Sequence, residues 1–364
     1  MKIQLALVAL VLAFSLQPSA MFAQGSLTPP GAPAAGMKTL AQIEPRTPIS
    51  SAPFTISTSG SYYLTTNLTV SAGNAINVSA NNVALDLNGF TIASTESPAG
   101  TSVAISLNSV TNITIVHGCI SSGVTNSTSG VFGGSGFGYG IYYSGSQPVN
   151  TRVAGVSVSG CRVNGLFLGT SSVVEFCTVN TVGNFGIVAQ TVSDSQGQNC
   201  GNTAVYAYAN ANNCFGYNSG SANGVYANAA NNCYGTSSSG TGVSATTANN
   251  CYGYAASNGN GVGATTANNC YGVSVNGGYG ISATVATGCY GECDAGTGIG
   301  VLASTANNCT GYNYGVSYGI YAYYIATGCF GSSVSGTGIN AFLASVCHGI
   351  GTPALSVTHN VNSF

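Results

Sequence analysis

The octapeptide "TTANNCYG" spans residues 246–253, and the same eight letters return 19 residues later at 265–272. The interval belongs to a longer series in which a cysteine is followed, two residues later, by a glycine. Eight cysteines share this arrangement at spacings of 18 to 20 residues: Cys214, Cys233, Cys251, Cys270, Cys289, Cys309, Cys329 and Cys347. A unit of this length cannot bury a hydrophobic face alone, so the repeat predicts a solenoid of stacked copies.

Two further columns of the repeat predict its backbone. The residue before the cysteine is asparagine or glycine in seven of the eight units, as in Asn250 and Gly288. These residue types adopt the left-handed conformation of a tight turn most readily. Earlier in the unit, apolar residues two positions apart, such as Val243 and Ala245, show the inward-facing pattern of a β-strand. Helix is disfavoured, because glycine, asparagine, threonine and serine dominate the repeat.

We therefore expect an all-β, parallel solenoid of roughly a dozen coils, each of 18–23 residues. Each coil should lie about 4.8 Å above the one before it. In such a stack Asn249, Asn268 and Asn307 are expected to form one column whose side-chain amides bond along the axis.

The segments upstream show the same design with less regular lengths: "AINVSANNVALDLNGFTI" (75–92), "VAISLNSVTNITIVHGCI" (103–120) and "GLFLGTSSVVEFCTV" (165–179). On these residues the chain resembles the right-handed parallel β-helix proteins of the pectate-lyase-like superfamily, over roughly residues 37–347. "VALDLNGFTI" is similar to the first full coil of many bacterial members. The resemblance implies a right-handed β-helix. It implies no single activity, because the superfamily includes lyases, hydrolases, epimerases, adhesins and passive surface proteins.

The start of the chain has the features of a secretory leader. Residues 1–23 combine a charged start, an apolar run and small residues, with cleavage expected after Ala20 or Ala23. We assign the remainder to a flexible linker (24–36), an N-terminal cap segment (37–70), irregular coils (71–200), regular coils (201–349) and a C-terminal tail or last strand (350–364). Within the cap segment, "MKTLAQIE" (37–44) fits one or two helical turns or an extended lead-in equally well. The leader predicts a secreted or cell-surface protein that does not span a membrane.

Charged residues are scarce, at 12 of 364, and Arg162 is the last cation. A phosphate backbone and an anionic membrane surface both require clustered lysine and arginine, so the composition argues against both partners. Because 45% of the residues are hydrophobic, the chain can still bury a core. Weak self-repulsion also makes association between copies plausible.

The cysteine column has two interpretations. Thirteen cysteines in an exported protein suggest disulfides, and stacked positions fall within bridging distance. However, side chains in register point the same way, and cysteine suits a narrow apolar core. We favour buried, largely unpaired thiols over a disulfide ladder. The column lacks the CxxC or Cys/His spacing of a metal site, and Cys293, which lies off the column, is the thiol to test for reactivity.

If the cysteines face inward, the residues after them face outward. Four of these are the candidate binding residues Tyr234, Tyr252, Tyr271 and Tyr290. The column can stabilise the sheet as a ladder of like neighbours, which is the interpretation we prefer. It can also bind sugar rings or another copy of the protein, and the two roles are compatible.

Catalysis would require a base with cations, or converging carboxylates. The residues able to supply them are dispersed along the chain: Asp86, Arg152, Arg162, Glu175, Asp194, Glu292, Asp294 and His348. No catalytic motif of the superfamily can be carried over onto them. We therefore expect no catalytic residues, no metal and no cofactor. A rank of threonines suited to ice binding is also short and mixed, consisting of Thr246, Thr265, Thr284 and Ser304.

These observations favour a secreted, non-enzymatic β-helix with a structural, surface or adhesive role that can associate with itself. Two alternatives remain. One is a solenoid that binds extracellular polysaccharide through the outward tyrosines, and the other is a polysaccharide lyase or hydrolase.

Overall fold

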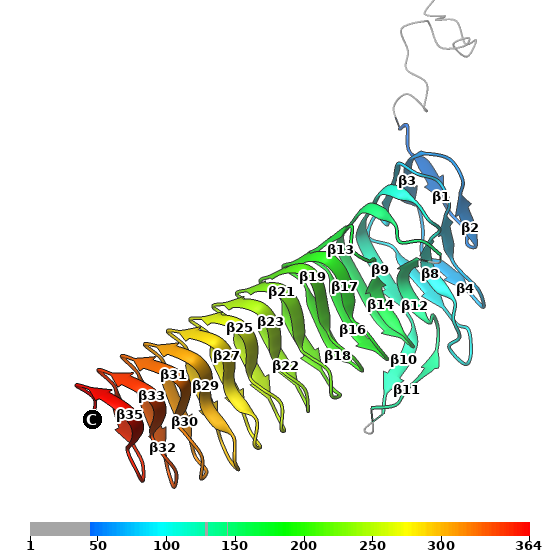
Figure 1. Cartoon of the computed structure of the whole chain (residues 1–364). Helices are drawn as coiled ribbons and strands as arrows, with labels where there is room; N and C mark the ends of the chain where they lie inside the picture. Colours follow the sequence, from blue (N-terminus) through cyan, green and yellow to red (C-terminus); the bar gives the residue numbers. More distant parts are fainter. Residues whose placement is uncertain (1–43, 128–129, 144) are drawn as a thin grey trace, which may run out of the picture. The chain divides into compact units, whose positions relative to one another are not determined.

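The computed structural model describes residues 44–127, 130–143 and 145–364. From Arg46 onward the chain winds into a parallel β-solenoid of about 16 turns, without a helix among the described residues (Figure 1). The predicted all-β parallel solenoid is confirmed, but a dozen coils is too few. The signal peptide (1–23), the linker (24–36) and the start of the cap segment (37–43) lie outside the described residues.

The coils beyond the predicted dozen lack the pattern of a cysteine followed two residues later by a glycine, which we call the cysteine-glycine signature. Phe54–Val70, assigned to the cap segment, already forms one complete coil beneath the next. At the other end, Leu355–Val361 pairs in parallel with the preceding coil and adds a further strand. The signature marks only the turns that the regular repeat shapes, so a count based on it misses both ends of the solenoid.

Each N-terminal coil contributes up to three strands, which stack into three faces named here by their order in the coil. The first face contains β2 (Phe54–Ile56), β5 (Ile76–Val78), β8 (Val103–Leu107), β12 (Tyr139–Tyr143) and β14 (Asn164–Phe167). The second face contains β1 (Thr47–Ile49), β3 (Gly60–Leu64), β6 (Val83–Asp86) and β15 (Ser172–Glu175). Two long strands, β9 (Thr111–Ser121) and β13 (Val149–Cys161), pass from the second face into the third.

The third face carries short strands along the whole solenoid: β4 (Leu68–Val70), β7 (Thr91–Ser94), β16 (Thr178–Val182), β18 (Gln196–Cys200), β20 (Phe215–Asn218), β22 (Tyr234–Ser237), β24 (Tyr252–Ala255), β26 (Tyr271–Ser274), β28 (Tyr290–Cys293), β30 (Thr310–Asn313), β32 (Phe330–Ser333) and β34 (His348–Ile350). An antiparallel hairpin of β10 (Gly123–Asn126) and β11 (Phe132–Ser135) projects between two coils.

In the C-terminal half one strand per coil covers both the first and the second face. These strands are β17 (Ile187–Ser193), β19 (Val205–Asn212), β21 (Val225–Asn231), β23 (Val243–Asn249), β25 (Val262–Asn268), β27 (Tyr279–Thr287), β29 (Ile299–Asn307), β31 (Ile320–Thr327), β33 (Ile339–Ser345) and β35 (Leu355–Val361). Each pairs in parallel with the next, and the repeat letters fall opposite one another, as Val243 does with Val262.

The turn before each repeat cysteine is left-handed, as predicted. Seven of the residues there, all asparagine or glycine, have φ between 50° and 62°, such as Asn250 at 52° and Gly288 at 62°. Val346 occupies the same place at φ 54°, although a β-branched residue is strained in that conformation. The stack therefore imposes the turn even where the residue does not favour it.

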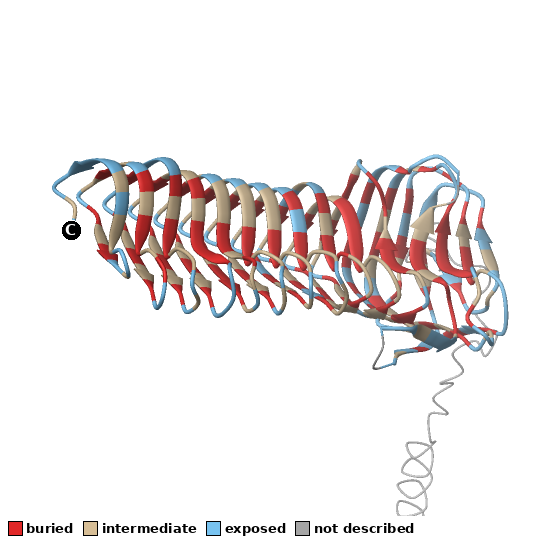
Figure 2. Ribbon diagram, turned by 60° about the horizontal axis from the view of Figure 1, so that its bottom comes forward, coloured by how far each residue is buried: buried red, intermediate tan, exposed pale blue. Residues whose placement is uncertain are grey.

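The core of the regular coils is thin. Val262, Ala267 and Cys270 are buried, and Figure 2 shows buried residues repeating from coil to coil along the solenoid. At the third position of the repeat, a Cβ added to Gly253 would collide with the carbonyl oxygen of Gly261 on the opposite wall. The glycine that follows each cysteine is therefore required because two backbones touch across the core.

Asparagine side chains form the expected ladder over part of the stack. Nδ2 of Asn268 donates to Oδ1 of Asn249 at 2.9 Å, and Nδ2 of Asn249 donates to Oδ1 of Asn231 at 2.8 Å. The prediction is wrong for Asn307, which pairs in register with Thr287 and Thr327. Threonine has no amide to continue the ladder, so it stops at Asn268.

We predict that Gly253→Ala destabilises the protein by about 1–3 kcal/mol, because the added methyl overfills a core closed by two backbones. Gly263→Ala is the matched control, since its Cβ would lie 3.5 Å from Thr241 and 3.6 Å from Asn260, at ordinary contact distance. The control should be neutral or stabilising by about 0.4–1 kcal/mol. Urea denaturation measures both changes, and equal effects of the two variants would contradict the thin core.

Candidate functional site

The four tyrosines proposed as binding residues lie together on the third face, each at the start of its strand. The ring centroids of Tyr234 and Tyr252 are 4.6 Å apart at an interplanar angle of 13°. Tyr252 and Tyr271 are 5.1 Å apart at 7°, and Tyr271 and Tyr290 are 4.6 Å apart at 4°. The rings therefore stack almost in parallel at the spacing of the coils.

The stacked rings extend beyond the four residues taken from the sequence. Phe215 stacks on Tyr234 at 5.2 Å, and Tyr312 continues from Tyr290 at 5.5 Å. The repeat position itself is Thr310 in that coil, so Tyr312 contacts the column from two residues further along the strand. The repeat could not reveal this contact, because it compares only equivalent positions.

The column then continues to the last residues of the chain. It passes from Tyr312 to Phe330, from Phe330 to His348 at 5.5 Å and 10°, and from His348 to Phe364 at 4.9 Å. His348, considered as a catalytic candidate, is thus a member of the aromatic column.

Close stacking limits what the tyrosines can bind. The faces of the Tyr252 and Tyr271 rings are covered on both sides by neighbouring rings, so the column presents ring edges and hydroxyl groups. A sugar that stacks on an aromatic residue requires an open ring face. The geometry therefore favours the stabilising role of the column over sugar binding.

One tyrosine hydroxyl group of the column is hydrogen-bonded to a carboxylate. Oη of Tyr271 donates to Oε2 of Glu292 at 3.0 Å. Burial, followed by this hydrogen bond, raises the pKa of Tyr271 above its usual range, and burial together with Glu292 raises the pKa of Tyr290 to about 12. These tyrosines remain neutral near pH 7, and Glu292 lies on strand β28.

The eight repeat cysteines lie behind the column, at most 2% exposed. Their thiols donate to backbone carbonyls, as Sγ of Cys270 does to Ala248 of the preceding coil at 3.4 Å and to Asn268 at 3.3 Å. All thirteen cysteines are free, and only Cys119 is partly exposed. The arrangement is that of a small apolar core residue with a weak donor.

Cys293 is also buried, in register with Ser274 and Asn313. Burial raises its pKa, and its Sγ donates to the carbonyl of Ala295 at 3.3 Å. A protonated, buried thiol is a poor nucleophile, so the structure does not favour Cys293 as a reactive residue.

Serine replaces cysteine at two further places in the same column. The backbone N–H of Cys177 donates to Oγ of Ser195 at 3.0 Å, and that of Cys347 donates to Oγ of Ser363 at 3.0 Å. The position therefore suits a small side chain whose oxygen or sulfur atom can accept a hydrogen bond from the backbone N–H of the preceding coil. A search for cysteine alone could not find these two coils.

The charged residues are distributed as small pairs. Asp86 lies 3.4 Å from Arg46 and 3.5 Å from His117, and Arg152 contacts Glu175 at 2.8 Å. Asp86 and Glu175 share one row of the second face but are three coils apart, about 14 Å at the usual strand spacing. That separation exceeds the distance over which two carboxylates act on one glycosidic bond.

The remaining acids and the last arginine lie apart from these pairs. Asp194 accepts from Nδ2 of Asn213 at 3.1 Å, whereas Asp294 and Arg162 are exposed. Among the described residues, no three His, Cys, Asp or Glu side chains are grouped so as to hold a metal ion.

A second aromatic cluster lies on the first face and was missed from the sequence. Phe167, Phe185, Val188, Tyr206 and Tyr208 line a cleft of about 220 Å³. Its rings are strongly tilted, by 52° between Phe167 and Phe185 and by 82° between Phe185 and Tyr206. Tyr206 is the exception, because its ring also stacks on Tyr226 at 4.7 Å and 22°. The cluster lies where the irregular coils meet the first regular coil, so no repeat spacing signals it.

Comparison of the chain with protein-family models, curated proteins and solved structures gave no match. Within the described ranges, no helix is long and apolar enough to cross a membrane. The fold follows from the strand pairing described above, and any functional proposal has to be argued from these surfaces.

We predict that the native protein exposes at most one thiol to Ellman's reagent near pH 8, namely Cys119, because burial raises the pKa of thiols such as Cys161 to about 12. Unfolding without a reductant should release all thirteen. Fewer than thirteen thiols after unfolding would show disulfides, and several fast thiols in the native state would contradict the buried column.

Proposed function

We propose that this protein is a secreted, non-enzymatic structural protein of the cell surface or extracellular matrix, built as a stiff solenoid that associates with copies of itself. The observation that carries the proposal is the chemical uniformity of the coils after Arg162. Residues 163–364 contain four acids and neither lysine nor arginine. Their outward positions hold mainly threonine, serine, asparagine and tyrosine.

Such a surface suits assembly better than catalysis. The charges of a catalytic site or of an ionic ligand site are scarce over most of the solenoid, and those present are mostly paired or hydrogen-bonded. Low charge also removes the repulsion that keeps most soluble proteins apart. The continuous hydrogen-bonded stack supplies stiffness, because each coil is joined to its neighbours on every face.

Concentration-dependent light scattering and negative-stain microscopy of the leader-free protein test the proposal. We expect a particle mass that rises with protein concentration, and elongated particles that pair or bundle. High salt should change the association little, because few charges are involved. A strictly monomeric particle at all concentrations would contradict the self-associating role.

A carbohydrate-binding role is the second candidate, and the first-face cleft supports it better than the tyrosine column does, because the ring of Phe185 is tilted against both of its neighbours. If a glycan array retains a ligand, Phe185→Ala should weaken its binding about tenfold or more, because an unstacked aromatic ring is lost from the lining of the cleft. Tyr252→Ala should leave glycan binding unchanged and lower stability instead. Loss of binding with Tyr252→Ala alone would assign the ligand to the column.

The enzyme hypothesis is tested with acidic and neutral polysaccharides, with and without calcium. The dispersed carboxylates lead us to expect no new reducing ends and no unsaturated products. Either product would contradict the non-enzymatic proposal.

A further inference from the structure

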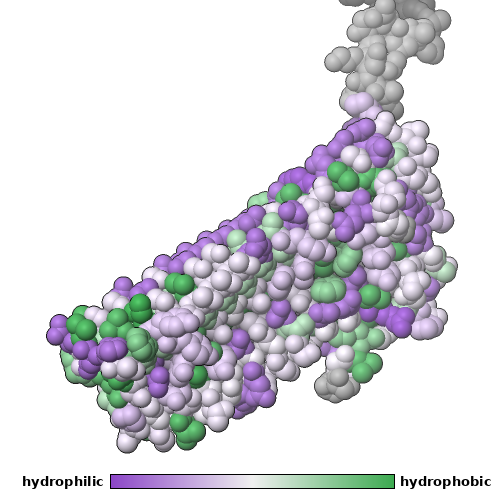
Figure 3. Space-filling model, viewed as in Figure 1, coloured by the Kyte–Doolittle hydropathy of each residue, from purple (hydrophilic) through white to green (hydrophobic). Residues whose placement is uncertain are grey.

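Exposed hydrophobic side chains are concentrated near the C-terminal end of the solenoid. Eleven of the eighteen large hydrophobic residues that are exposed in the described part of the chain lie between Tyr314 and Phe364. In the space-filling view, strongly hydrophobic residues lie at this end and around the N-terminal coils, whereas the middle of the solenoid is pale (Figure 3). The distribution marks one region as chemically different from the otherwise uniform coils.

Four of these residues lie side by side on two adjacent strands. Tyr323, Tyr324 and Ile325 lie on β31, and Phe342 lies on β33, with exposed fractions of 56%, 64%, 37% and 53%. We refer to these four residues as the C-terminal patch. A register shift between Ala322 and Ile325 adds a residue where the chain turns from the first face to the second, and both tyrosines are exposed there.

The fold does not require this patch. In the preceding coils the position of Tyr323 is filled by Thr246, Thr265, Thr284 and Ser304, in strands with the same inward pattern. The solenoid therefore forms without large apolar side chains at these places. Leaving them exposed is unfavourable in water, so a partner surface that covers them would stabilise the assembly.

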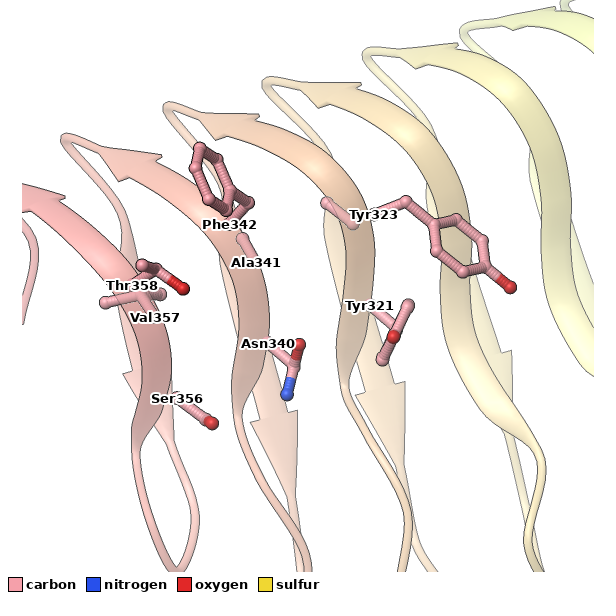
Figure 4. Close-up of a pocket in the computed structure, with 9 residues that line it drawn as sticks. Tyr321, Tyr323, Asn340, Ala341, Phe342, Ser356, Val357 and Thr358 are labelled. Atoms are coloured by element: carbon pink, nitrogen blue, oxygen red, sulfur yellow. The ribbon is translucent and has the colours of Figure 1, made fainter.

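A groove of about 340 Å³ lies beside the patch. Tyr321, Asn340 and Ser356 are among the residues that line it, and Tyr323, Phe342 and Thr358 border it (Figure 4). A projecting aromatic ring and a hollow thus occupy the same surface. An interface between two identical copies related by a twofold axis needs this combination, because one patch must complement itself.

The charge of the surface also fits a second copy. None of the residues of the patch or the groove carries a formal charge, so their burial removes no ion from water. The ring of His359 meets that of Phe342 edge-on at 5.1 Å. A strongly charged partner would find no counter-charge here, whereas another copy presents the same neutral surface.

We infer that the C-terminal patch is the contact through which two copies of this chain associate face to face, with the exposed rings of Tyr323, Tyr324 and Phe342 of each copy packed against those of the other. The inference rests on the proposed self-association and names its surface. It predicts a discrete dimer as the first assembled species, whatever larger assemblies follow.

Sedimentation velocity of the leader-free chain over a range of concentrations tests this contact. Phe342→Ser and Tyr323→Ser should each raise the dimer dissociation constant about tenfold or more, as loss of a central aromatic anchor does. Tyr314→Ser is the matched control, because Tyr314 is 51% exposed and follows a third-face strand, away from the patch. It should change the constant less than about twofold, and circular dichroism checks that every variant is folded.

A charge placed in the groove gives a second, independent variant. Thr358 is exposed at the groove, so Thr358→Lys should leave the fold intact and bring two like charges together in the dimer. Dimerisation should weaken and recover partly at high salt, where the repulsion is screened.

The outcomes separate this inference from the proposed function. If the wild-type chain dimerises and the patch variants do not, the inference is supported. If patch variants and Tyr314→Ser dimerise as well as the wild type, the named contact is wrong while self-association stands. A wild-type chain that never associates overturns both.

Discussion

The backbone hydrogen bond that joins each coil to the next at a fixed register is the constraint on which the structure depends. The N–H of Tyr252 donates to the carbonyl of Cys233 at 2.8 Å, and the N–H of Tyr271 donates to that of Cys251 at 2.9 Å. From β21 to β29 the pairing runs without a register shift, so equivalent residues there lie directly above one another. The tyrosine stack, the asparagine ladder and the cysteine column all follow from this alignment.

Fixed register also explains how a core this thin can be stable. The N-terminal coils enclose large side chains such as Leu85, Ile105 and Phe137, all fully buried. The regular coils bury a valine or isoleucine, such as Val262 or Ile281, and otherwise mainly small residues, between walls that touch at Gly253 and Gly261. Each coil therefore gains little from apolar burial, and its stability comes from hydrogen bonds and ring stacking repeated along the stack. Cysteine suits this core because it is small, apolar and able to donate weakly to a carbonyl.

Structural features that recur from coil to coil could be predicted from the sequence, and features confined to single coils could not. The parallel fold, the left-handed turn and the Asn249–Asn268 ladder were all predictable, because each depends on one column of like residues. The number of coils depends on the irregular ends of the solenoid. The ladder ends where Thr287 takes the place of an asparagine, and Cys293 is buried in register with Ser274 and Asn313. The first-face cleft and the C-terminal patch arise where coils of unequal length meet or where the register shifts. No sequence pattern indicates where such junctions and register shifts occur.

The contrast between regular and irregular coils also bears on function. The regular coils carry few charges, and their stacked tyrosines cover one another. The candidate binding surfaces therefore lie in coils that depart from the regular repeat. These are the cleft around Phe185 and the apolar patch around Phe342. This arrangement is consistent with a structural role in which a few coils bind partners and the remaining coils form the scaffold.

Removing one coil tests the central claim most directly. Deletion of residues 246–264 takes out one 19-residue period and joins Ala245 to Thr265, which restores the local sequence "SATTANNCYG". If the coils are stacked in register, the shortened protein should keep the same β-sheet circular dichroism per residue and unfold in one cooperative transition near the wild-type temperature. Deletion of nine or ten residues from the same place should abolish that transition. Loss of folding on removal of the full period, or equal tolerance of the half period, would contradict the account.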